Sequence, residues 1–242
     1  MVLRRRAGEI VRASWRLYRA RAPAFAAIGT LSIPIALVGL VVTALLARLP
    51  WFEPAPDVSD EANRVLIAGA VSAVLWPLTI LLVSAAVAEL LESGATRPWR
   101  ALAAVRHRAW DLARSFFPMV VLIVLLSLTV VGAPVAVWLA VRMQLLAPTV
   151  MLEHTAGWTA VRRSGRLVRG RWLHTAVVTA LIWLVVGATG ITLGLVLLIA
   201  VPGLPLWSVS AVALLCQVAL VPLGGIALTL LYGDARAERD GS

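Results

Sequence analysis

Residues 173–201 read LHTAVVTALIWLVVGATGITLGLVLLIAV and contain no aspartate, glutamate, lysine or arginine. An α-helix rises about 1.5 Å per residue, so about 20 apolar residues cross the roughly 30 Å of hydrocarbon in a bilayer. This stretch is long enough to span a membrane with room for tilt. A water-soluble helix needs a polar face, and this stretch has no charged residue with which to build one.

Apolar runs of similar length recur along the chain, which is 61% hydrophobic and only 14% charged. Soluble domains contain about 25% charged residues. The composition therefore predicts an all-α, polytopic integral membrane protein that buries its apolar surface against lipid. The expected transmembrane helices are residues 25–46, 65–91, 117–132, 135–152, 173–201 and 209–232.

Glycine and proline predict where these helices turn or bend. The segment 132–134 (Gly-Ala-Pro) separates the third run from the fourth, and we expect a tight hairpin there. Proline lacks the N–H that a helix interior uses, so it kinks a membrane helix whose neighbours must satisfy the freed carbonyl groups. We expect kinks at Pro34, Pro77, Pro148 and Pro222.

The distribution of arginine predicts the orientation in the membrane. The segments before the first run, after the second and after the fourth are rich in arginine, whereas the segments between them are acidic or uncharged. Cytoplasmic loops of membrane proteins carry an excess of basic residues. We therefore expect both termini on the cytoplasmic side, with the first run retained as a span rather than cleaved as a signal peptide.

A net charge of +10 and a pI near 11.6 raise the question of nucleic-acid binding. The basic residues flank apolar runs, and no soluble segment is long enough to form a nucleic-acid-binding fold. We therefore expect anionic lipid headgroups, rather than nucleic acid, as the partners of this charge. The single cysteine, Cys216, rules out a disulfide within the chain, and we expect no cofactor and no metal.

Two arginine-rich segments resemble each other. Residues 11–21 (VRASWRLYRAR) and 161–171 (VRRSGRLVRGR) agree at most positions without a gap, and residues 109–114 are a weaker third copy. Each copy precedes an odd-numbered run. The chain is therefore predicted to be a single membrane domain of three units, each a basic amphipathic interfacial helix followed by a transmembrane hairpin. The units are residues 8–91, 98–152 and 156–232, followed by a short cytosolic tail at 233–242.

The arginines of the two best copies share one helical face, opposite apolar residues. A helix of this kind lies in the plane of the membrane, in the headgroup layer. Three interpretations remain open, because the arginines either only fix topology, bind anionic lipid, or dock a cytosolic protein partner. The positions are Arg12, Arg16, Arg19, Arg162, Arg166 and Arg169.

Arg142 lies well inside the fourth apolar run, where an arginine costs at least about 2.5 kcal/mol unless it is paired or hydrated. The candidate partners are Glu89, near the inner end of the second run, and Glu153, further along the fourth. In an unbroken helix Glu153 would be roughly 16 Å away, too far to pair, so Glu89 is the favoured partner. An interhelical ion pair or snorkelling is the preferred interpretation, and a substrate or lipid site is the alternative.

Glycine spacing predicts close packing of the fifth span, where Gly190 and Gly194 form a small-xxx-small pair. Gly224 and Gly225 lie beside Pro222 in the sixth span. A minor alternative is that the helix is unwound there, as at transporter sites. No set of metal ligands, no serine–histidine–aspartate set at suggestive spacing and no glycine-rich phosphate loop is found, so catalysis has no support in the sequence.

Three segments carry a resemblance to a known family: residues 147–153 (APTVMLE), 160–172 (AVRRSGRLVRGRW) and 229–236 (TLLYGDAR). They resemble the membrane domain associated with glycerophosphoryl diester phosphodiesterases, a family of multi-span bacterial and archaeal proteins, many without a catalytic domain. In fused members, hydrolysis belongs to a separate soluble barrel with a His-Arg-Gly motif. This chain has only His107-Arg108-Ala109 and no room for the barrel, so the resemblance implies a membrane domain without that activity.

Two functions fit these features. The leading hypothesis is a non-enzymatic scaffold or accessory subunit of a bacterial cytoplasmic membrane, which organises lipid or a protein partner at the cytoplasmic face. The alternative is a transporter or channel subunit for a small molecule or lipid, with a site near Arg142.

Overall fold

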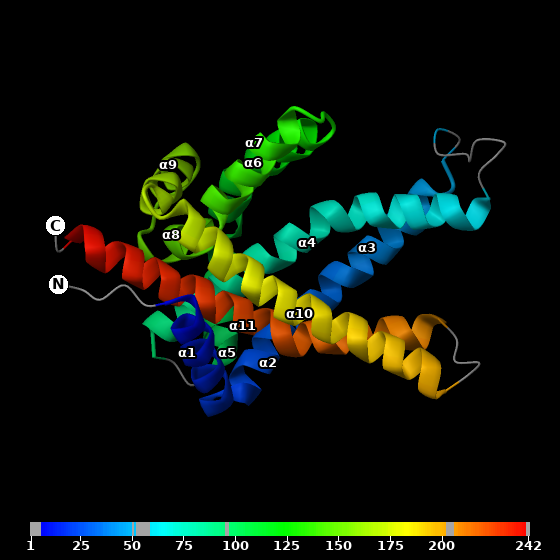
Figure 1. The fold of residues 1–242 in the computed structure, drawn as a ribbon, viewed down its shortest axis with the longest axis horizontal. Coiled ribbons are helices and arrows are strands. Elements are labelled where there is room, and N and C mark those ends of the chain that lie inside the picture. The colour runs from blue at the N-terminus through cyan, green and yellow to red at the C-terminus, as the bar shows by residue number, and fades with distance from the viewer. Residues whose placement is uncertain (1–5, 50, 52–58, 95–96, 202–205, 241–242) are drawn as a thin grey trace.

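A computed structural model describes residues 6–49, 51, 59–94, 97–201 and 206–240. The chain is 87% helical with no strand among these residues, so the predicted all-α class is confirmed. The helices, shown in Figure 1, are α1 (Ala7–Ala20), α2 (Ala22–Gly29), α3 (Ser32–Leu46), α4 (Asp60–Glu92), α5 (Pro98–His107), α6 (Ala109–Ser127), α7 (Gly132–Met143), α8 (Leu146–Leu152), α9 (Trp158–Val168), α10 (Trp172–Ala200) and α11 (Leu206–Asp240).

Six stretches of the described residues are long and apolar enough to cross a bilayer, as the sequence predicts. Their outward surfaces are apolar, and the side chains of Leu40, Val65 and Leu184 are 67%, 66% and 66% exposed. So large an exposed apolar surface is stable against lipid rather than water. The chain is therefore a multi-pass membrane protein. Its spans are Ala22–Leu46, Ala62–Glu92, Ala109–Ser127, Gly132–Leu152, Trp172–Leu197 and Leu214–Arg239.

The first and fourth spans are each broken into two helices. α2 gives way to α3, and α7 gives way to α8, within one membrane crossing. Pro34 and Pro148 lie in the first turn of α3 and α8, where the missing N–H would have no helical partner in any case. The kinks expected at these two prolines are therefore breaks just before them. Pro77 and Pro222 lie inside continuous helices.

The turn between the third and fourth spans comes earlier than the sequence predicts. Residues 132–134 form the first turn of α7 rather than the hairpin itself. The Oγ1 atom of Thr129 accepts a hydrogen bond from the N–H of Gly132 at 3.0 Å, which starts the new helix. A Cβ atom at position 132 would lie 2.3 Å from the carbonyl oxygen of Leu126, so the turn requires glycine there.

α11 is longer than expected, because it continues to Asp240 instead of ending in a tail at 233–242. Residues 241 and 242 lie outside the described residues. Gly224 and Gly225 do not unwind the helix. A Cβ atom on Gly224 would lie 3.2 Å from the ring of Trp183, and one on Gly225 would lie 3.1 Å from Val87. These glycines therefore allow α10 and α4 to pack closely against α11.

The short helices α1, α5, α8 and α9 lie at the end of the molecule that holds both termini (Figure 1). The helix pairs α3–α4, α6–α7 and α10–α11 extend away from this end. α11 runs through the centre and packs against α1, α2, α4 and α10. The pair α6–α7 diverges from the other two pairs. A short helix precedes each pair, as expected, although residues 109–114 begin α6 instead of forming part of such a helix. That the three units are copies of one internal repeat stays a prediction.

α2 rests directly on the backbone of α11. Gly29 is buried, and a Cβ atom there would lie 1.8 Å from the carbonyl oxygen of Val218. That carbonyl lies four residues before Pro222, which has no N–H to donate to it. Gly29 therefore points a Cα–H at an oxygen that the helix itself leaves without its regular donor.

Substituting Gly29→Ala should destabilise the protein by about 1–3 kcal/mol, because the added methyl group meets helix backbone that has no room to move. This loss should exceed the gain of up to about 1 kcal/mol that alanine normally brings to a helix. Thermal unfolding in detergent micelles measures the change. Gly69→Ala in α4 is the matched control, since a Cβ there meets nothing within 4 Å. Equal stability of the two variants would show that α2 is not seated on α11.

Candidate functional site

The helices α1 and α9 each bury one face and expose another. Ile10 and Ser14 of α1 are buried, and Ser164 and Leu167 of α9 are buried. The exposed faces carry the arginines that the sequence places at helical spacing. We term these six residues the arginine faces, formed by Arg12, Arg16 and Arg19 on α1, and by Arg162, Arg166 and Arg169 on and just after α9.

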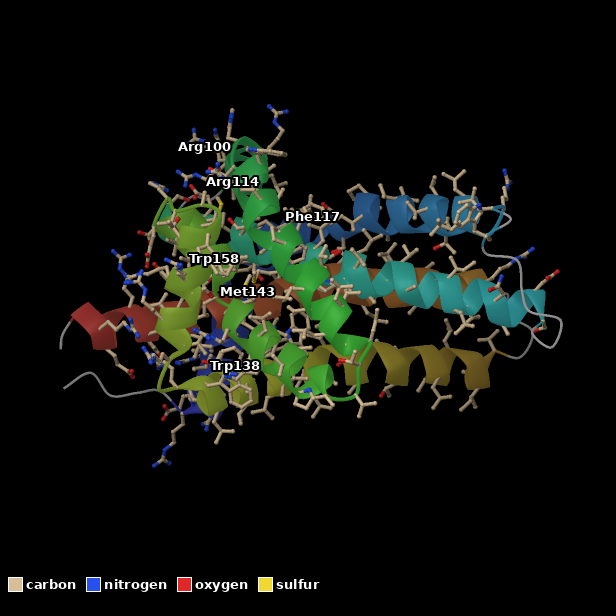
Figure 2. The ribbon with its side chains drawn as sticks, turned by 90° about the horizontal axis from the view of Figure 1, so that it is seen from above. Arg100, Arg114, Phe117, Trp138, Met143 and Trp158 are labelled. Carbon is tan, nitrogen blue, oxygen red and sulfur yellow. The ribbon has the colours of Figure 1, made fainter. Side chains whose placement is uncertain are left out.

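Exposed tryptophans accompany the arginines at this end of the molecule. Figure 2 shows Arg100, Arg114 and Trp158 in the half near the termini, where most nitrogen-bearing side chains gather. The guanidinium carbon of Arg162 lies 5.7 Å from the ring centroid of Trp158, within cation–π range. Tryptophan favours the membrane–water interface, and arginine reaches from there to lipid phosphate. The arrangement is typical of a surface at headgroup level.

Arg142 lies within the fourth span, as the sequence suggests, but it is not isolated there. The break between α7 and α8 places it in the last turn of α7, where the negative end of the helix dipole stabilises a cation. Its guanidinium carbon lies 4.3 Å from the ring centroid of Trp138. The guanidinium also rests against Gly165 of α9, where a Cβ atom would lie 2.7 Å from Nη2. Cation–π attraction of about 0.5–2 kcal/mol partly offsets the cost of its desolvation.

Two hydrogen bonds fasten the end of α7 to the next helices. The Oγ of Ser164 donates to the carbonyl of Arg142 at 2.7 Å, and the Nε1 of Trp172 donates to the carbonyl of Trp138 at 3.3 Å. The carbonyl of Arg142 is among the last four of α7, which have no partner within the helix, so the hydroxyl of Ser164 satisfies it. The bond from Trp172 adds a second link one turn earlier in α7. Arg142 thus belongs to a packed junction of α7, α9 and α10.

Glu153, just after α8, is held by two other helices. Its Oε2 accepts a hydrogen bond from the Nε of Arg163 on α9 at 2.7 Å, and its Oε1 accepts one from the hydroxyl of Tyr232 on α11 at 2.8 Å. The side chain of Glu153 is 14% exposed, and Tyr232 is 2% exposed. We term Glu153, Arg163 and Tyr232 the carboxylate clasp, because one carboxylate joins three helices.

Arg142 forms an ion pair with neither expected glutamate among the described residues. Glu153 is engaged in the carboxylate clasp. Glu89 is half-buried near the end of α4, where its carbonyl accepts the N–H of Ser93 at 2.9 Å. The structure therefore does not join these three side chains by an ion pair, and the face of Trp138 takes the place that the sequence assigns to a carboxylate.

A second polar link joins the start of α10 to the end of α11. Arg171 is only 6% exposed, and its Nη1 lies 3.2 Å from Oε2 of Glu238. The carboxylate clasp and this pair both tie α11 to the elements around α9. The polar contacts of the last span are therefore concentrated at the end where the termini lie.

Sequence reasoning missed most of these contacts. Arg163 is the arginine of α9 that falls off the exposed face at helical spacing, which is one signal that it has a partner within the fold. Tyr232 is a hydroxyl-bearing side chain at the end of an apolar run, which is another. Neither signal identifies Glu153, because the partners are 10 and 79 positions away from it in sequence.

The fold and these contacts define an all-α, multi-pass membrane protein, most of whose exposed arginines gather at one end. No family model matches the chain, and neither curated proteins nor solved structures provide a match. The resemblance to the membrane domain associated with glycerophosphoryl diester phosphodiesterases therefore stays a prediction.

Substituting Tyr232→Phe should lower the free energy of unfolding by about 1.5–3 kcal/mol, because a buried hydrogen bond to a charged carboxylate is lost. Thermal unfolding in micelles measures this. Tyr18→Phe is the matched control, since the hydroxyl of Tyr18 has no hydrogen-bond partner among the described residues. A Tyr232→Phe variant as stable as the control would mean that the hydroxyl does not hold Glu153.

Proposed function

We propose that this protein is a non-enzymatic membrane scaffold whose arginine faces bind anionic phospholipid headgroups at the cytoplasmic surface. One observation carries the proposal. Among the described residues, Arg114, Arg163 and Arg171 form ion pairs, whereas no arginine of the arginine faces is found in one. No carboxylate among the described residues therefore neutralises their charge, although the opposite sides of the same helices are buried in the fold.

The chemistry of arginine suits this role. Its planar guanidinium group donates paired hydrogen bonds to phosphate oxygens and stays charged at any physiological pH. Each arginine near an anionic leaflet contributes about 1 kcal/mol to membrane attraction. The face on α9 is held in a fixed orientation, because Ser164 bonds to α7 and Arg163 bonds to Glu153. A rigid face binds headgroups at a lower entropic cost than a mobile one.

The same features support an orientation with both termini in the cytoplasm of a bacterial cell. The basic helices and both termini share one end of the molecule (Figure 1), and the excess of basic residues marks the cytoplasmic side. The anionic cytoplasmic leaflet then faces the arginine faces.

A transport site at Arg142 has less support. Its guanidinium group is packed against Trp138 and Gly165, and it lines neither the cavity between α3–α4 and α10–α11 nor the one between α4 and α6–α7. A half-buried cation held by an aromatic ring and a helix end fits a structural junction.

Replacing Arg162, Arg166 and Arg169 together by Gln should reduce retention of phosphatidylglycerol relative to phosphatidylcholine by roughly tenfold or more, since each arginine is worth about 1 kcal/mol before screening. Native mass spectrometry of the protein released from mixed-lipid nanodiscs measures the bound lipid. The control replaces Arg48 and Arg64, two exposed arginines beside the connection between α3 and α4, by Gln. Unchanged retention in the triple variant would overturn lipid binding and direct the search to a cytosolic protein partner.

The orientation predicts which sites a membrane-impermeant maleimide can reach. In a Cys216→Ala background, Ala237→Cys should react only in inverted membrane vesicles, because the end of α11 would face the cytoplasm. Leu49→Cys, just after α3, should react only in intact spheroplasts. The reverse pattern would show that the termini lie outside the cell.

A further inference from the structure

A cavity of about 1,020 Å³ lies between the pair α3–α4 and the pair α10–α11. The two pairs diverge as they extend away from the termini (Figure 1). Small-molecule sites in proteins usually measure about 300–1,000 Å³, so this cavity is large enough for a lipid-sized ligand. It is bounded by helices that the sequence and the structure place in the membrane. A ligand would therefore enter sideways from the hydrocarbon.

The cavity is kept open by small residues of α10. A Cβ atom on Gly187 or Gly190 would meet nothing within 4 Å, and both glycines line the cavity. The sequence predicts close helix packing around Gly190. In the structure, no other helix of this chain packs closely against Gly187 or Gly190. The space that the glycines create is left for something else.

Polar groups without partners lie in the wall of the cavity, and two of them are placed to meet a ligand. Ser32 is 2% exposed, and its Oγ has no hydrogen bond. Gln217 interrupts the apolar stretch of α11, and its amide has no hydrogen-bond partner among the described residues. Both residues line the cavity, and none of the described residues that line it is charged. An unpaired hydroxyl and an unpaired amide in hydrocarbon are costly, and an oxygen-bearing ligand relieves both.

We propose that this cavity binds an uncharged lipid with a small head that carries hydrogen-bonding oxygens. The head lies at Ser32 and Gln217, and the hydrocarbon chain lies along the apolar walls formed by residues such as Ile35, Val71 and Leu75. With no cation among its described residues, the lining selects against a phospholipid with a charged head. The site is separate from the arginine faces and does not depend on them.

The test uses the full chain in nanodiscs with a diacylglycerol that carries a diazirine in one acyl chain, and a phosphatidylglycerol with the same modified chain. After illumination, peptide mass spectrometry locates the labelled residues. We expect saturable labelling of residues 32–43 or 183–190 by the diacylglycerol, at least fivefold above the phosphatidylglycerol. Equal labelling by both probes would overturn the proposal.

Two variants separate this site from general contact with lipid. Gly190→Leu fills the cavity and should reduce diacylglycerol labelling at least fivefold, whereas Gly69→Leu, whose Cβ meets nothing within 4 Å on an exposed part of α4, should not. Gln217→Leu removes the amide without adding bulk and should cause a similar loss, which keeps the test valid should Gly190→Leu fail to fold.

The outcomes also distinguish other occupants. Labelling that survives both cavity variants would overturn the proposal. A change of oligomeric state in Gly190→Leu, with diacylglycerol labelling unaffected in Gln217→Leu, would assign the cavity to a second copy of the chain instead. Replacing Arg162, Arg166 and Arg169 by Gln should leave diacylglycerol labelling unchanged. The experiment therefore distinguishes a wrong assignment of the arginine faces from a wrong assignment of the cavity.

Discussion

A backbone polar group in hydrocarbon must find its partner within the protein, because lipid offers none. Two irregular points of this fold show how the constraint acts. Where α7 ends in the middle of a span, Ser164 supplies a hydroxyl to its carbonyl. Where Pro222 leaves a carbonyl of α11 without a regular donor, Gly29 brings up its Cα–H. The breaks and close approaches therefore determine which helices are neighbours, and the neighbours determine the fold.

The two ends of the molecule are built differently as a result. At the end with the termini, the carboxylate clasp and the Arg171–Glu238 pair tie α11 to the elements around α9. Away from the termini, the helix pairs diverge and present apolar side chains and the cavity next to Gly190. One end is thus cross-linked by directional polar contacts, while the other relies on non-directional packing against lipid.

The helical class and the spans follow from composition and run length, because length and polarity alone decide whether a helix can cross a bilayer. The sequence predicts irregular helices at Pro34 and Pro148, but as kinks within one helix. The structure has a break between two helices at each place. The partner of Arg142 was not predictable, because it depends on the break after α7 and on α9 folding back against it, with Gly165 making room. Helical periodicity does not tell which side chains meet in three dimensions. It therefore could not show that Arg142 contacts the face of Trp138 rather than a carboxylate.

The contact between Gly29 and the carbonyl of Val218 also bears on how the chain is made. Because α2 packs on α11, its packing surface does not exist until the ribosome has synthesised residues 206–240. During synthesis, α2 lies in the bilayer without its packing partner while the segments between it and α11 insert. Assembly therefore cannot proceed strictly from one hairpin to the next, and the arrival of α11 is the event that closes the bundle.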